Sequence, residues 1–168
     1  MFMGKIGSLF FMRFKLLDPN RVLSAIEPRV RFLFTKGFLV FAALLVLAAV
    51  SIIATRSDEV FGRVKNFLLI GAGSGAGFGT IWVTALCIVC LHELGHGVAC
   101  KHFGGDVHEM GFLLMFFNPC FYCNVNDAWT FESRTARLLT TGAGGLVELV
   151  LGSACVIIWS LTPDGSMV

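Results

Sequence analysis

Long uncharged runs dominate the pattern of hydrophobic and polar positions along this chain. The first covers residues 37–55 and lies between Lys36 and Arg56. Its 19 residues, at about 1.5 Å each, extend over roughly 28 Å, which is enough for the hydrocarbon core of a bilayer. This run predicts a transmembrane helix.

Two later runs have the same character. Residues 66–91 carry no charge and lead directly into His92, while residues 138–163 contain Glu148 as their single charge. Because 66–102 is too long for one untilted helix, the second span is expected at about 78–102. The third is expected at about 138–161.

The connection over residues 103–135 has a different pattern. Its uncharged part, 110–126, is interrupted by Asn118-Pro119, and proline removes a backbone donor and disfavours helix in the residue before it. Non-helical backbone survives at membrane depth only when protein buries it or when it lines a cavity. We therefore expect a re-entrant or interfacial loop that is strand-like around residues 111–122, rather than a fourth span.

Composition agrees with a membrane location. Hydrophobic residues make up 56% of the 168 positions and charged residues only 14%, against about 25% charged in an average soluble domain. The expected fold class is an all-α membrane protein with about three transmembrane helices and a strand-containing loop between the second and third. Residues 1–36 are expected to form a basic N-terminal segment, and 37–168 a membrane domain that is incomplete at its C-terminus.

Basic residues predict the orientation of these spans. Ten Lys and Arg lie before the first span and between the second and third, against three in the loop at 56–65. The positive-inside rule then places the N-terminus in the cytosol, and three spans leave the C-terminus outside. No basic run with interleaved aromatic residues indicates nucleic acid as a partner, whereas membrane lipid is an expected one.

Glycine and cysteine patterns are less informative. Glycines at every second position from Gly71 to Gly79 lack the strand–turn–helix context of a dinucleotide-binding loop. They form either a smooth helix face for close packing or an irregular entry to the second span. Cys120 and Cys123 form one C-x-x-C without the second pair of ligands that a structural zinc site needs.

The residues with the clearest chemistry are His92-Glu93-Leu94-Gly95-His96. On a helix, positions i and i+4 share a face, so both imidazoles can bind one metal ion, and zinc is the expected cofactor. Glu93 lies beside them, where a carboxylate can take a proton from water that the metal activates. Both histidines are expected about 7–14 Å below the cytosolic end of the second helix. The alternative is that they only cap the helix at the membrane interface.

A catalytic zinc site needs a third protein ligand. Glu148, a lone carboxylate within the third span, is the best candidate in this chain, although it could instead form a hydrogen bond across a helix interface. His102 stands at the third position of an extended motif, but Ala99 replaces the glycine that would break the helix there. His108, Glu109 and Asp127 are expected to be solvated loop residues.

At this point the chain resembles the site-2 protease family of membrane zinc metallopeptidases, in particular a bacterial branch of peptide zinc metalloproteases. The matching stretches, from about Phe14 onward, are Asp18–Arg21, Leu91–Gly97, Cys100–Gly105, His108–Gly111, Pro119–Asn124, Asp127–Trp129 and Gly144–Glu148. The resemblance implies zinc on His92 and His96, Glu93 as catalytic acid and base, and cleavage of peptide bonds within a bacterial inner membrane. The family's third ligand is an aspartate in an N-P-…-D-G motif, which this sequence lacks. We expect the chain to be a fragment and inactive alone; otherwise Glu148 substitutes or the protein is a pseudoenzyme.

Two functions therefore follow from the sequence. The first is a zinc-dependent endopeptidase that acts on a membrane protein or peptide at or within the bilayer. The alternative is a non-catalytic subunit of an export complex, which binds metal or presents substrates to its partners.

The predicted orientation can be tested with reporter fusions. Fusions after Ala54 and after Val168 should both report the external side of the membrane, because the basic residues concentrate on the other side. A cytosolic signal at Val168 would mean that residues 110–126 cross the membrane after all.

Overall fold

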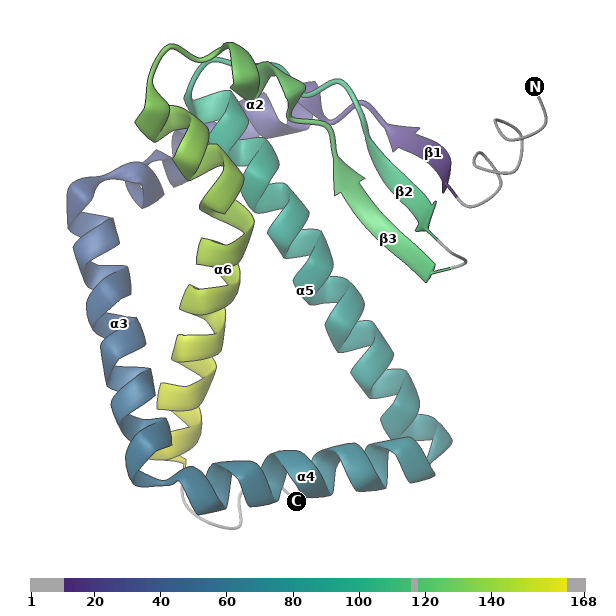
Figure 1. Cartoon of the computed structure of the whole chain (residues 1–168), viewed down its shortest axis with the longest axis vertical. Coiled ribbons are helices and arrows are strands. Elements are labelled where there is room, and N and C mark those ends of the chain that lie inside the picture. The colour runs from purple at the N-terminus through teal and green to yellow at the C-terminus, as the bar shows by residue number, and fades with distance from the viewer. Residues whose placement is uncertain (1–10, 116–117, 163–168) are drawn as a thin grey trace. The chain divides into compact units, whose positions relative to one another are not determined.

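The chain alternates long helices with one small sheet (Figure 1). A computed structural model describes residues 11–115 and 118–162. Its elements are β1 (Phe11–Leu17), α2 (Asn20–Val30), α3 (Lys36–Thr55), α4 (Ser57–Gly73), α5 (Gly75–His102), β2 (Met110–Met115), β3 (Asn118–Cys123) and α6 (Arg134–Leu161). Two 3₁₀ turns, Arg31–Phe34 and Asn126–Thr130, complete the described structure.

These elements form two compact units, and each is described by itself. The first combines residues 11–31 with 89–145, and the second combines residues 32–88 with 146–162. Because α5 and α6 pass through both, each long helix contributes one end to the first unit. The boundary predicted at residue 36 stays a prediction.

The first unit contains an antiparallel sheet in the order β1-β2-β3 (Figure 1). Phe112 of β2 lies between Phe14 of β1 and Phe121 of β3 in the register. The rings of Phe112 and Phe121 meet edge to face with centroids 4.9 Å apart, a favourable cross-strand pair.

Gly111 of β2 lies close against the backbone of β1. The register shifts between Lys15 and Leu17, so that β1 carries one extra residue opposite Gly111 and Met110. A Cβ atom on Gly111 would collide with the carbonyl oxygen of Phe14. Only glycine therefore fits this position of the strand.

The end of α5 is defined by its backbone hydrogen bonds. The N–H of Gly104 donates to Lys101 O at 3.0 Å, and that of Gly105 donates to Cys100 O at 2.9 Å. Gly104 has φ +89°, the left-handed conformation that glycine adopts most easily. This is the Schellman pattern, and it turns the chain sharply out of the helix at His102.

Helix α2 packs against the last turns of α5. Leu23 is fully buried, and a Cβ atom on Gly97 would lie only 2.9 Å from Leu23 Cδ1. Glu27 accepts hydrogen bonds from Arg31 Nε at 3.0 Å and from His102 Nδ1 at 2.8 Å. The Arg31 bond, followed by that of His102, lowers the pKa of Glu27 to about 2, so this carboxylate stays charged.

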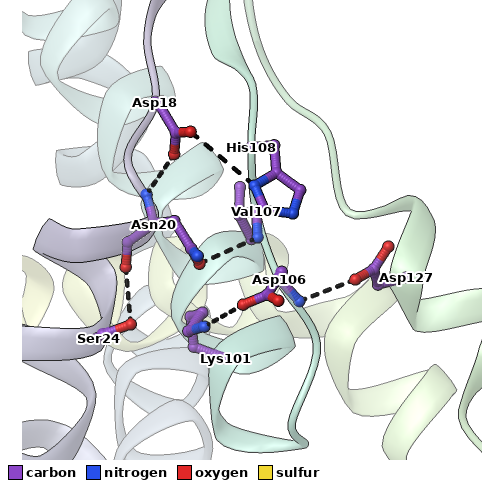
Figure 2. Close-up of polar contacts among 8 residues, drawn as sticks. All are labelled: Asp18, Asn20, Ser24, Lys101, Asp106, Val107, His108 and Asp127. Carbon is purple, nitrogen blue, oxygen red and sulfur yellow. Dashed lines mark hydrogen bonds and ion pairs between the residues drawn. The ribbon is translucent and has the colours of Figure 1, made fainter.

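A second polar cluster holds the segment after α5 against the start of α2 (Figure 2). Lys101 Nζ donates to Asp106 Oδ1 at 2.6 Å, which lowers the pKa of Asp106. The N–H of Asp106 donates to Asp127 Oδ2 at 2.9 Å, and the N–H of Val107 donates to Asn20 Oδ1 at 3.4 Å. These contacts fix the course of residues 103–109 on the first unit.

In the second unit, α4 and α5 are separate helices. Ser74 is extended between them, and its Oγ accepts the N–H of Gly77 at 3.1 Å. A Cβ atom on Gly77 would lie 2.6 Å from Gly71 Cα, so the turn needs glycine for this close approach. The glycine run is therefore the irregular entry to the second span, one of the two alternatives left open by the sequence.

Three described helices are long and apolar enough to cross a membrane: α3 with 20 residues, and α5 and α6 with 28 each. They include the predicted spans at 37–55 and 138–161, and α5 begins three residues before the predicted 78. Strands β2 and β3 confirm the strand-like loop at 111–122. The predicted all-α class omits one strand, β1, which lies in the N-terminal segment. Its basic residues interrupt the run of apolar residues by which a strand is recognised.

The close approach at Gly111 predicts that a larger residue at this position destabilises the fold. Gly111→Ala should lower the thermal unfolding midpoint in detergent, because the new methyl group meets backbone that cannot rotate away; a cost of about 1–3 kcal/mol is expected. Gly142→Ala is the matched control, since nothing lies within 4 Å of its Cβ position. A midpoint for Gly111→Ala at or above that of the unmodified protein would contradict the strand register.

Candidate metal centre

The last turns of α5 bring the two histidines of the motif together. His92 and His96 lie four residues apart on one helix face, and their Nε2 atoms are 3.0 Å apart. Two imidazoles on a tetrahedral zinc ion, each bonded at about 2.0–2.1 Å, hold their nitrogens roughly 3.3 Å apart. The observed separation is close to that needed by a shared ion.

The orientation of His96 is set by the backbone of α6. His96 Nδ1 donates to the carbonyl oxygen of Thr140 at 2.7 Å. A carbonyl oxygen can only accept, so the proton is on Nδ1. His96 Nε2 is then the acceptor of a hydrogen bond from His92 Nε2 at 3.0 Å, and a bound metal ion would take the place of that proton. Metal-binding histidines are commonly oriented by such a bond from the second ring nitrogen.

Gly144 leaves space in front of both histidines. A Cβ atom there would lie 2.5 Å from His92 Nε2 and 2.6 Å from His96 Nε2. Any side chain would therefore occupy the volume between the two nitrogens, close to where a shared ion must lie. The residues present fit a metal ion on these three observations: the converging nitrogens, the fixed proton on His96 and the space kept by glycine.

The described residues do not place a third metal ligand beside His92 and His96. Within residues 11–115 and 118–162, no group of three or more His, Cys, Asp or Glu is arranged to hold a metal ion. His102 binds Glu27, as described above. Glu148 belongs to the second unit and stays a prediction as a ligand.

A pocket of about 400 Å³ opens beside the histidines within the first unit. Its lining includes Glu93, His96, Cys123, Trp129, Arg137 and Thr141. The carboxylate of the motif thus faces a space large enough for water and for part of a ligand. The backbone of Cys123, at the end of β3, lies beside Glu93, so the sheet forms part of the surroundings of this carboxylate.

Cys123 itself is not a nucleophile at neutral pH. Burial, with the nearby Glu93 charge as a smaller cause, raises the pKa of its thiol to about 12. The thiol is therefore neutral and acts as a small apolar wall of the pocket.

Three loop residues expected to be solvated have structural contacts as well. His108 is exposed and lies 3.9 Å from Asp18 Oδ2 (Figure 2). Glu109 accepts the hydroxyl of Tyr122 at 2.5 Å, and Asp127 accepts the N–H of Asp106. Their contacts hold the loop in place at a distance along the chain from the motif.

Sequence reasoning missed the contributions of Thr140, Arg137 and Trp129. The Thr140 carbonyl leaves no signature in a sequence, because every residue carries one. Arg137 could have been noticed, since it stands seven residues before Gly144, two turns away on the same helix face. Comparison with family models, with curated proteins and with solved structures finds no match to this chain.

Proposed function

We propose that this chain is part of a zinc-dependent endopeptidase that hydrolyses peptide bonds at or within a bilayer, of the site-2 protease type. One observation carries the proposal: two imidazole nitrogens converge to 3.0 Å in front of a glycine that keeps the space between them open. Glu93 faces the adjoining pocket, where a substrate carbonyl and water have room to enter.

The membrane setting is part of the proposal. Three long apolar helices support a multi-pass protein, and the distribution of basic residues supports a cytosolic N-terminus. The resemblance to the bacterial branch supports the inner membrane of a bacterium. Ionisable groups on an apolar helix are costly to insert, and this favours a functional reason for the motif.

The residues of the site divide the chemistry among them. A zinc ion, when bound, supplies a Lewis acid that polarises a carbonyl group and lowers the pKa of water to about 7. His92 and His96 hold the ion through Nε2, and the Thr140 carbonyl keeps the His96 proton on Nδ1. Glu93 accepts the proton of the attacking water and gives it to the leaving amine. The substrate must be locally unwound, because a regular helix encloses its carbonyl groups in hydrogen bonds.

A second candidate function is a non-catalytic metal-binding or substrate-presenting subunit of an export complex. It is favoured by the ligand count, since the described residues bring two histidines together but no third ligand. Glu148 as third ligand would favour the enzyme instead. The two functions differ in whether Glu93 is required for turnover.

Metal binding can be tested at Gly144. We expect about one zinc ion per chain in the purified full-length protein, and Gly144→Ala should weaken its affinity by roughly 10–100-fold, because the new methyl group occupies the space between the two nitrogens. Elemental analysis and competition with a chelator would measure this. His92→Ala combined with His96→Ala should remove the zinc completely.

Gly145→Ala is the matched control for Gly144→Ala. It adds the same methyl group to the same helix one position later, where nothing lies within 4 Å. Unchanged zinc affinity in Gly144→Ala, or equal losses in both variants, would mean that the ion does not occupy this space.

The catalytic role of Glu93 can be separated from metal binding. Glu93→Gln keeps the size of the side chain and removes the base, so zinc content should persist while cleavage of a membrane peptide falls by about 100-fold or more. Zinc content and cleavage would be measured on the same preparation. If the full-length protein binds zinc and Glu93→Gln leaves its cellular phenotype unchanged, the non-catalytic function takes the place of the protease.

A further inference from the structure

The pocket beside Glu93 and His96 contains one half-buried guanidinium, that of Arg137. Its Nη1 donates to the carbonyl oxygen of Phe131 at 2.7 Å, and this bond holds the group in place. In the part of the chain that the structure describes, no carboxylate lies within 4 Å of it. A partly desolvated cation that no carboxylate pairs with directly is a binding point for an anion from outside.

The chemistry of arginine narrows the choice of anion. The planar guanidinium has five donors, of which the Phe131 bond uses one, and its fork matches the two oxygens of a carboxylate. Trp129, also in the lining, is 80% exposed and offers a large apolar surface beside this charge. A ligand with a carboxylate and an apolar neighbouring group therefore fits both features.

The position of Arg137 on α6 relates it to the histidines. Gly144, whose Cα faces both Nε2 atoms, lies seven residues further along the helix, which is a rise of roughly 10 Å on the same face. An extended peptide covers that distance with about three residues. A peptide held at Arg137 by a carboxylate would thus have a bond within about three residues of that carboxylate near Glu93.

We propose that Arg137 binds a carboxylate of the peptide substrate and so determines where the substrate is cut. The inference rests on the proposed protease function and adds the substrate class: peptides with a carboxylate within about three residues of the scissile bond. The carboxylate comes from an Asp or Glu side chain or from a free C-terminus. An anionic lipid headgroup is the less favoured occupant, because Glu93 lines the same pocket and a lipid there would block the proposed site.

A binding measurement tests this without requiring cleavage. The probes are fluorescent ten-residue peptides of Leu, Ala and Gly, made with a free C-terminus or an amidated one, and with one internal Asp or Asn. They are titrated into the full-length Glu93→Gln protein in a neutral detergent, with binding followed by fluorescence anisotropy. Carboxylate peptides should bind about 10-fold or more tightly than their neutral counterparts. The free-terminus and Asp series separate the two sources of the carboxylate.

Substitution of Arg137 tests whether this residue causes the preference for carboxylate peptides. Arg137→Gln in the same background should remove the preference for carboxylate and leave binding of the neutral peptides unchanged, while Arg137→Lys should retain part of it. The matched control is Arg134→Gln, an exposed arginine at the first position of α6 that does not line the pocket. Zinc content, measured on each variant, reports whether the first unit has kept its fold.

Each outcome has a defined meaning. Equal binding of carboxylate and amide peptides, or equal loss for both in Arg137→Gln, would overturn the inference. So would a preference abolished by adding an anionic lipid but not by a neutral one, because the lipid would then be the occupant. In the protein with Glu93 intact, the cut site is compared with the position of the carboxylate in the peptide. Cleavage that needs Glu93 but does not depend on that position would support the protease and refute the role of Arg137. Arg137-dependent binding without any cleavage would refute the protease and leave the anion site.

Discussion

The hydrogen bond from His96 to the carbonyl of Thr140 is the contact on which the rest of the site depends. It joins two helices that are 44 residues apart in sequence at these positions, and it fixes the protonation of an imidazole at the same time. Because the acceptor is a backbone oxygen in a regular helix, the bond needs α6 to approach α5 very closely. Gly144, one turn further on, permits that approach, since any side chain would meet both rings.

The sheet and α2 of the first unit pack around the part of α5 that carries the motif. The sheet ends at Cys123 against Glu93, and α2 places Leu23 against Gly97, one residue after His96. The hydrogen bonds of Glu27 with Arg31 and His102 hold α2 at the end of α5. The basic N-terminal segment thus has a structural role besides the membrane orientation that its charges predict, because its strand and helix complete the surroundings of the motif.

Much of this architecture could be predicted from the sequence. The three long apolar helices followed from uncharged runs, the strands from the Asn118-Pro119 interruption, and the paired histidines from helical spacing. Strand β1 could not be predicted, because a strand that gains its stability from pairing with residues almost a hundred positions away carries no local signal of that partner. The break at Ser74 was left open for a related reason, since glycines allow both a helix and a turn.

The same limit explains why the site was predicted only in part. The proposed metal-binding motif is local to one helix, so His92, Glu93 and His96 could be picked out by type and spacing. The groups that surround them come from other elements: a carbonyl at Thr140, the backbone of Cys123 and the missing side chain of Gly144. Backbone groups and absent atoms do not distinguish one sequence from another until the fold brings them to the site.

One face of α6 contributes several of the groups that surround the motif on α5. Arg137, Thr140 and Gly144 follow one another at spacings of three and four residues, so a guanidinium, the acceptor for His96 and the open space beside both imidazoles lie along one stripe. Glu148 continues the same spacing along the sequence and stays a predicted third ligand. A helix can provide these functions together only if its small residues lie opposite the histidines and its charged residues lie one or two turns away. A larger residue at 144 would separate the helices and remove the acceptor, the space and the pocket wall in one step.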